Sequence, residues 1–163
     1  MHFFEYREKN FLIRTVTRHL PVAGLYFSLA AAQAADFNIE VSVTGVEVDK
    51  GQVIAALYNS EDTYMKTSVE QLIGSPGKDD TVVLTFENQP PGEYAIAVVY
   101  DKNNDGKLDT GLFNIPTEKV GFSNDAPIRF GPAKWSAAKF SLSDADLKTE
   151  INLKKRSKKD YSD

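Results

Sequence analysis

Oxygen-bearing side chains recur at alternate positions in the segment Asp101–Asp109, which reads Asp-Lys-Asn-Asn-Asp-Gly-Lys-Leu-Asp. This spacing matches the first nine positions of the EF-hand type of calcium loop, in which a glycine at the sixth position makes the sharp turn. Carboxylate, amide and carbonyl oxygens are the hard donors that Ca²⁺ prefers in proteins. The predicted metal ligands are the carbonyl oxygen of Lys107 and the side chains of Asp101, Asn103, Asp105 and Asp109.

The twelfth position of this loop, where a bidentate glutamate normally completes the ligand shell, is Leu112. Water, or a carboxylate from Glu118 or Asp125, would have to fill that place. We therefore expect weak calcium binding, with a dissociation constant of ~10⁻⁴–10⁻³ M as in extracellular modules. The alternative is a turn without a cation, because Asp, Asn and Gly also form ordinary Asx turns.

Residues 1–34 have the pattern of a secretory signal peptide. Arg14 and Arg18 precede the apolar run Leu20–Ala32, and the segment Ala32-Gln33-Ala34 places small residues at the −3 and −1 positions, so we place cleavage after Ala34. The apolar run is short for a bilayer, and we expect no transmembrane segment after cleavage. The predicted location is periplasmic or extracellular.

Cleavage would leave residues 35–153 as one domain and residues 154–163 as a basic tail that we expect to be disordered. Both histidines, His2 and His19, leave with the leader, and the chain has no cysteine. The mature chain therefore has no imidazole base, no His/Cys zinc site and no disulfide. A pair of carboxylates, Glu118 and Asp125, remains as an acid and a base, which makes a hydrolase of envelope glycans an alternative function.

Charge is divided unevenly along the chain. The stretch Asp36–Leu153 contains 19 acidic and 10 basic residues. This acidic body argues against nucleic acid as a partner and suits cations. The tail, with Lys154, Lys155, Arg156, Lys158 and Lys159, is either a solvated terminus or a contact for anionic lipid or polysaccharide. Polysaccharide or protein of the cell envelope is the expected partner class.

Alternation of apolar and polar residues predicts β-strands along most of the chain. Tyr94–Tyr100 is apolar on both faces, so we place it at the centre of a sheet. Asp49-Lys50-Gly51 predicts a hairpin between the first two strands, and Thr67–Ile73, with capping-box spacing, is the one predicted helix. The other predicted strands are Phe37–Thr44, Val53–Leu57, Val82–Phe86, Phe140–Leu142 and Leu147–Leu153.

These elements predict an all-β fold, an antiparallel Greek-key sandwich of roughly seven strands with one short helix. Glycine and proline interrupt the long connection 110–137, yet its aromatic content predicts order. Phe122, Asn124, Arg129 and Trp135 in it form either a ligand-recognition surface or a segment that caps the sandwich.

Several motifs in order carry a resemblance: Pro90-Pro91-Gly92-Glu93-Tyr94-Ala95, the acidic loop, Gly121-Phe122-Ser123-Asn124, Phe130-Gly131-Pro132 and Ala137-Ala138-Lys139-Phe140. In this order they resemble the secreted bacterial family called domain of unknown function 2141. The resemblance implies export and an immunoglobulin-like or prealbumin-like sandwich, and it implies no reaction. More loosely, the loop is similar to those of calcium-bearing repeat domains in surface adhesins, from which Leu112 departs.

Together these patterns predict an exported, non-catalytic binding or structural module with a weak Ca²⁺ site. The alternatives are the carboxylate-based hydrolase and a metal-responsive periplasmic accessory protein, in which the ion is a signal.

Overall fold

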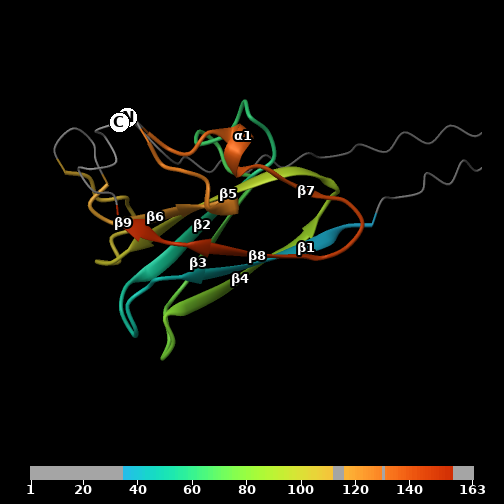
Figure 1. The fold of residues 1–163 in the computed structure, drawn as a ribbon. Coiled ribbons are helices and arrows are strands. Elements are labelled where there is room, and N and C mark those ends of the chain that lie inside the picture. The colour runs from blue at the N-terminus through green and yellow to red at the C-terminus, as the bar shows by residue number, and fades with distance from the viewer. Residues whose placement is uncertain (1–34, 112–115, 130, 156–163) are drawn as a thin grey trace, which may run out of the picture. The chain divides into compact units, whose positions relative to one another are not determined.

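Two β-sheets face each other in the computed structural model, which describes residues 35–111, 116–129 and 131–155 (Figure 1). The smaller sheet has the order β4-β1-β8, with β4 Thr81–Gln89, β1 Phe37–Thr44 and β8 Leu147–Asn152. The larger sheet has the order β3-β2-β5-β6-β9, and β7 pairs with the start of β5. Its strands are β2 Gln52–Tyr58, β3 Glu70–Gly74, β5 Gly92–Asp101, β6 Lys119–Phe122, β7 Phe140–Leu142 and β9 Lys154–Lys155.

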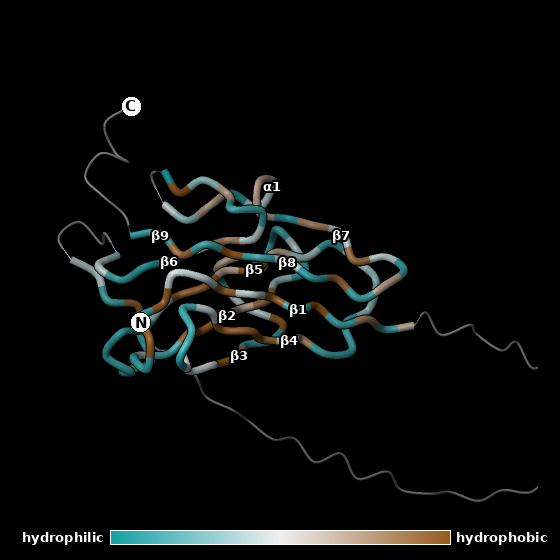
Figure 2. The backbone as a smooth tube through the Cα atoms, turned by 60° about the horizontal axis from the view of Figure 1, so that its bottom comes forward, coloured by the Kyte–Doolittle hydropathy of each residue, from teal (hydrophilic) through white to brown (hydrophobic). Residues whose placement is uncertain are grey.

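The main core lies between the two sheets. Alternate residues of β1, namely Ile39, Val41 and Val43, are fully buried against Val53 and Ile96 of the opposite sheet and their neighbours. Hydropathy along the backbone follows this arrangement, because the stacked strands are apolar and the turns at their ends are hydrophilic (Figure 2). The prediction of an all-β sandwich is confirmed.

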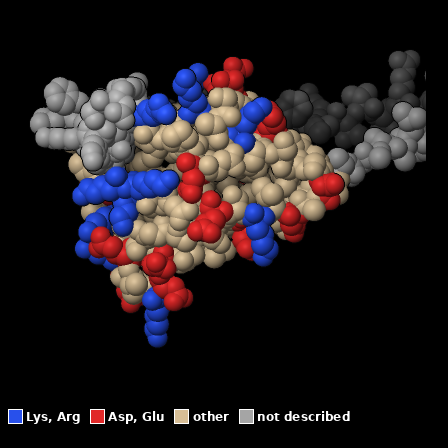
Figure 3. Space-filling view, in the orientation of Figure 1, with Lys and Arg blue, Asp and Glu red and all other residues tan. Residues whose placement is uncertain are grey.

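The outer faces of the two sheets differ. On the smaller sheet, the outer residues are mostly polar, with Val83 of β4 as an exposed apolar side chain, and Lys148 of β8 forms an ion pair with Glu40 of β1 at 3.0 Å. Basic and acidic side chains are interspersed over the face seen in Figure 3. On the larger sheet, the outer residues Ala95 and Ala97 of β5 are buried beneath the connection after β6, which contains Trp135. The fold therefore has three layers, two sheets and a covering segment.

This third layer explains the composition of β5. Tyr94, Ile96, Val98 and Tyr100 belong to the core between the sheets, whereas Ala95 and Ala97 belong to the outer cluster. A strand covered on both sides needs apolar residues at every position. The prediction that this strand lies at the centre of a sheet is confirmed, since β5 lies between β2 and β6.

The predicted helix Thr67–Ile73 is wrong. Residues Glu70–Gly74 form the edge strand β3, which pairs antiparallel with β2. The helical spacing of Val69 and Ile73 has no surface to pack on, and both side chains are exposed, Ile73 by 61%. A single short turn of helix is unstable without burial, whereas the edge of β2 supplies hydrogen-bonding partners. The one α-helix among the described residues is α1 Trp135–Ala138, which follows the 3-10 turn η2 Ser123–Asp125.

The predicted hairpin at Asp49-Lys50-Gly51 is also wrong, because the strands before and after this turn do not pair with each other. The turn is present, with positive φ at Asp49 and Gly51, but it joins β1 to a strand of the other sheet. β1 pairs antiparallel with β4 and parallel with β8, so the described strands include one parallel pair, and the prediction of a wholly antiparallel sandwich is wrong at this point. Turn chemistry predicts a reversal of the chain, but not which strand each neighbour pairs with.

The second sheet ends on residues that we assigned to the disordered tail. Lys154 and Lys155 form the short strand β9, which pairs antiparallel with β6. Gly121 of β6 allows the close approach of β8, because a Cβ at this position would lie 2.5 Å from Cγ2 of Ile151. No helix of the described residues is long and apolar enough to cross a membrane. The signal-peptide prediction, and residues 156–163 of the tail, lie outside the residues that the structure describes.

Candidate functional site: the acidic loop and the connection after it

Asp101, the last residue of β5, anchors the acidic loop. Its side chain is fully buried, and its carboxylate accepts hydrogen bonds from Gln52 Nε2 at 2.7 Å, from the Gly106 N–H at 2.8 Å and from the Asp105 N–H at 3.3 Å. Burial raises the pKa of Asp101, but the hydrogen bonds from Gln52 and from backbone N–H groups outweigh burial and hold the pKa below its usual value. The carboxylate is therefore ionised and fixed at the base of the loop.

Asn103 lies between two other carboxylates of the loop. Its amide Nδ2 donates to Asp109 Oδ2 at 3.1 Å and to Asp105 Oδ2 at 3.3 Å, while its Oδ1 accepts from the Asp105 N–H at 3.2 Å. The Lys107 N–H donates to Asp105 Oδ1 at 2.9 Å, and Gly106 takes the positive φ that the sharp turn requires. An amide dipole thus bridges the carboxylates that were predicted to share a cation.

Glu118 returns to the loop from the residue before β6. Its side chain is buried, with 8% exposure, and its two oxygens accept from the Lys102 N–H at 2.8 Å and the Asp109 N–H at 3.0 Å. Of the two carboxylates considered as replacements for the twelfth ligand, Glu118 is the one that lies at the loop. Leu112 itself lies outside the described residues.

Asp125 lies elsewhere in the fold. It follows the other end of β6, and its carboxylate accepts from the N–H and Nδ2 of Asn152 at 3.1 and 3.0 Å. Glu118 and Asp125 therefore have separate sets of donors and share no hydrogen-bonding partner among the described residues. This arrangement gives no support to an acid and base pair built from these two groups.

The donor set of the loop suits a hard cation, since Asp101, Asp105, Asp109, Glu118 and the Asn103 amide all offer oxygen. The present arrangement of these donor groups does not suit a cation. Among the described residues, no three or more acidic or histidine side chains are grouped so that they could hold a metal ion. The Asn103 amide also turns its nitrogen, not its oxygen, toward Asp105 and Asp109. A cation would require this amide to turn over.

The predicted ligand surface divides into buried and exposed parts. Phe122 and Trp135 are buried, and Trp135 lies edge-on to Tyr64, which lies edge-on to Tyr58, with ring centroids 5.5 and 5.3 Å apart. The Asn124 amide donates to the Lys139 carbonyl at 2.8 Å, so it fastens the connection to the chain after α1. Arg129 is exposed. These positions match the capping interpretation, although the segment covers a sheet face and not the open end of the sandwich.

The hydroxyl in the motif Gly121-Phe122-Ser123-Asn124 belongs to Ser123 and makes hydrogen bonds inside the fold. The residue is fully buried, and its Oγ donates to the Ala138 carbonyl at 2.6 Å and accepts from the Ile96 N–H at 2.9 Å. It therefore ties the connection to the centre of β5. Because this hydroxyl donates its proton to one backbone carbonyl and accepts from one backbone N–H, its role is structural.

The Tyr64 hydroxyl is buried and lacks a hydrogen-bonding partner among the described residues. Burial first, and then the neighbouring Tyr58, raises the pKa of Tyr64 to about 12. Stability from the un-ionised phenol is complete below the unfolded pKa of 10.0 and is lost as the pH rises to about 12.

We expect Tyr64→Phe to unfold at an equal or higher denaturant concentration at pH 8 and to lose less stability between pH 10 and 12. Denaturation curves across this range test the prediction, and an unchanged alkaline loss would contradict it.

Two groups of residues were missed at the level of sequence. Gln52 pairs with Asp101 across β2 and β5, and no spacing pattern signals a contact of that kind. The second group lines an apolar pocket on the outer face of the larger sheet and includes Met65 and Leu108. Met65 is 42% exposed and Leu108 is 41% exposed. Both lie outside the strands, where the alternation of apolar and polar residues predicts nothing about burial.

Comparison with known proteins gives one match. A family model described as "Uncharacterized protein conserved in bacteria (DUF2141)" matches residues 41–150, more than half of the chain. No curated protein and no solved structure matches the chain. The matched range includes the second half of β1, the acidic loop, Glu118 and the covering connection. The chain therefore belongs to the bacterial family of domain of unknown function 2141.

Proposed function

We propose that this chain is an exported, non-catalytic binding or structural module of the bacterial cell envelope, in which the loop Asp101–Asp109 holds a Ca²⁺ ion. The ion would stiffen the junction between β5 and the connection that covers the larger sheet. Export is supported by the leader pattern that ends at Ala34. The lack of histidine after residue 34 supports a non-catalytic role.

The observation that carries the proposal is the position of Glu118. Its carboxylate is buried beside the loop and is oriented by the N–H groups of Lys102 and Asp109. It therefore supplies near the loop the carboxylate that the twelfth position lacks. Asp101, Asp105 and Asp109 add three more carboxylates, which repel one another when no cation is bound. Neutralising this repulsion would favour binding.

The same geometry supports weak affinity. Ca²⁺ would have to displace the Asn103 amide from Asp105 and Asp109 and accept oxygen from it instead. Part of the binding free energy is then used to rearrange the loop, as in sites of ~10⁻⁴–10⁻³ M. At ~2 mM Ca²⁺ and a dissociation constant of ~0.1 mM, binding would stabilise the fold by ~1.8 kcal/mol. This magnitude suits a structural ion.

Thermal unfolding in calcium and in chelator tests the proposal. We expect a higher midpoint in millimolar Ca²⁺, and we expect this difference to disappear in the double variant Asp105→Ala/Asp109→Ala. These positions remove predicted ligands but leave the Asp101 and Glu118 hydrogen bonds to the backbone in place. Asp79→Ala/Asp144→Ala, which removes the same charge from other loops, should retain the calcium effect. Equal midpoints in calcium and chelator for the unsubstituted protein would overturn the proposal.

Asn103→Asp is expected to have opposite effects in chelator and in calcium. In chelator, the substitution replaces a donor that bridges Asp105 and Asp109 with a third carboxylate, so it should lower the unfolding midpoint. In calcium, the added carboxylate is a stronger ligand than an amide, so it should raise the affinity. Midpoints that fall equally in both conditions would show that the loop is a hydrogen-bonded turn and not a cation site.

A further inference from the structure

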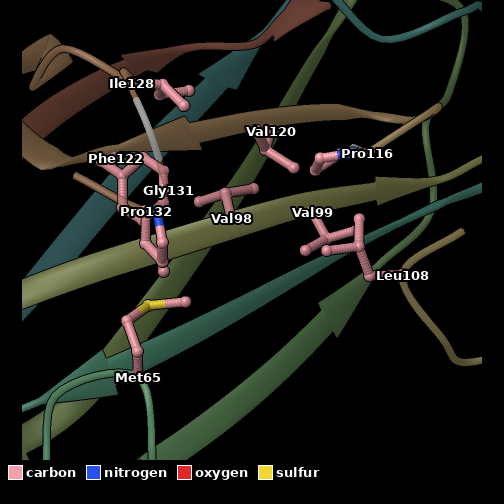
Figure 4. A pocket seen from close by; sticks show the side chains of 11 residues that line it. Met65, Val98, Val99, Leu108, Pro116, Val120, Phe122, Ile128, Gly131 and Pro132 are labelled. Atoms are coloured by element: carbon pink, nitrogen blue, oxygen red, sulfur yellow. The ribbon is translucent and has the colours of Figure 1, made fainter. Parts of the chain in front are cut away.

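An apolar pocket of about 240 Å³ opens on the outer face of the larger sheet. All eleven residues that line it are apolar, and they come from five separate parts of the chain (Figure 4). Val99 of β5 and Val120 and Phe122 of β6 contribute from the sheet, and Ile128 contributes from the covering connection. Leu108 of the acidic loop lies at the end of the pocket near Val99, and Phe122 and Pro132 lie at the other end (Figure 4).

The rim of this pocket is unusually apolar for a solvated surface. Met65, in the turn after β2, and Leu108 line the pocket and are each about two-fifths exposed. Large exposed apolar side chains that converge on a cavity indicate a binding site more often than single scattered ones do. Met65 is also unbranched and flexible, which suits contact with an aliphatic chain of variable shape.

A second, basic pocket of about 450 Å³ adjoins the apolar one. Gly131 and Pro132 line both pockets, and the second also includes Arg129 and Lys134. No ion pair between described residues includes either of these two cations. Two cations with no acidic partner within the described part of the chain therefore flank the Pro132 end of an apolar cavity.

We propose that the outer pocket binds a single-chain anionic amphiphile, whose aliphatic chain fills the apolar pocket and whose head group is held by Arg129 and Lys134. Charge complementarity selects the anion, and the continuous apolar lining selects the chain. The pocket volume of about 240 Å³ holds roughly eight methylene-sized groups if each takes ~30 Å³, the liquid share of a water molecule. This size fits one medium-length chain and excludes the paired chains of a whole phospholipid.

The inference is independent of the calcium proposal, because it uses none of the loop carboxylates. It also revises the sequence-based recognition surface. Arg129 keeps a ligand role, whereas Phe122 contributes to the wall of an apolar cavity and Trp135 does not line it.

Calorimetric titration of the purified protein with decanoate, below its micelle concentration, tests this site. We expect saturable binding at one site, with decyltrimethylammonium bound at least tenfold more weakly because its head group is cationic. Arg129→Gln/Lys134→Gln should weaken decanoate binding about tenfold and leave the binding of neutral decanol unchanged. Leu108→Glu should weaken decanoate and decanol alike, by blocking the mouth of the pocket with a charge.

Matched controls separate the site from general surface effects. Val83→Glu introduces a carboxylate at an exposed apolar residue of the smaller sheet, and Lys78→Gln/Lys148→Gln removes two exposed cations elsewhere. Both should bind decanoate like the unsubstituted protein. The proposal is overturned if decanoate gives no binding, if the cationic amphiphile binds as tightly, or if Arg129→Gln/Lys134→Gln has no effect. Binding to anionic phospholipid vesicles without binding to monomeric decanoate would also overturn it, in favour of a bilayer contact.

Discussion

Replacing Trp135 by alanine is expected to destabilise the fold by about 3–5 kcal/mol, the range for removing a buried aromatic side chain. Trp135 is only 7% exposed and packs in the outer cluster with Ala95, Ala97 and Phe122. It also lies edge-on to Tyr64, a contact that contributes beyond the buried area. The loss should appear as a large fall in the urea midpoint, because the third layer is part of the cooperative fold.

Two further variants serve as controls for this prediction. Trp135→Phe should recover a substantial part of the lost stability, since it restores most of the packing volume. Val83→Ala, at a side chain 55% exposed on the outer face of β4, should change the midpoint little. An unchanged midpoint in Trp135→Ala, together with loss of a bound ligand, would show that Trp135 belongs to a recognition surface and would contradict the capping assignment.

The second large effect is expected at Asp101. In chelator, Asp101→Ala should destabilise the fold by about 2–4 kcal/mol, because it leaves buried donors without acceptors. The groups left unpaired are Gln52 Nε2 and the Gly106 N–H, the two shorter contacts of the carboxylate. Denaturant unfolding in chelator measures this contribution separately from any bound ion.

The pH dependence at Asp101 has a defined sign. Because the pKa of this carboxyl is below the usual value in the folded chain, its contribution to stability is complete above that usual value, 3.8, and is lost as the pH falls through the lower folded pKa. The stability difference between the unsubstituted protein and Asp101→Asn should therefore shrink on acidification below pH 4. Asp105→Ala, at an exposed side chain, is the matched control and should show a smaller loss in chelator. A loss at Asp101→Ala no larger than at this control would contradict the anchoring role.

Much of the fold could be predicted from local patterns. Alternation located β1, β2, β4 and β8 because each has one buried and one less buried face. Apolar residues on both faces of β5 predicted a central strand, and the structure adds the reason, a covering layer on its outer side. The motif of Ser123 and Asn124 marks where this layer is fastened.

Other features depend on partners that are distant in sequence. Val69 and Ile73 have helical spacing, but the segment pairs with β2 as an edge strand, and a local pattern cannot represent that competition. The turn at Gly51 predicts a reversal but not that β1 joins another sheet. At the site, spacing predicts the acidic loop but leaves Glu118 and Asp125 as alternatives for the missing carboxylate, and only the fold brings Glu118 to the loop. The bond from Gln52 to Asp101 follows only from the register of β2 and β5.

Calorimetric titration of the chelator-treated protein with Ca²⁺ tests the central claim most directly. The proposal predicts one site with a dissociation constant of ~10⁻⁴–10⁻³ M and weaker binding of Mg²⁺, which demands a stricter octahedral geometry. It predicts loss of that binding in Asp105→Ala/Asp109→Ala. Absence of calcium binding, or equal binding in this double variant, would contradict it and would leave the loop Asp101–Asp109 as a hydrogen-bonded turn anchored by Asp101 and Glu118.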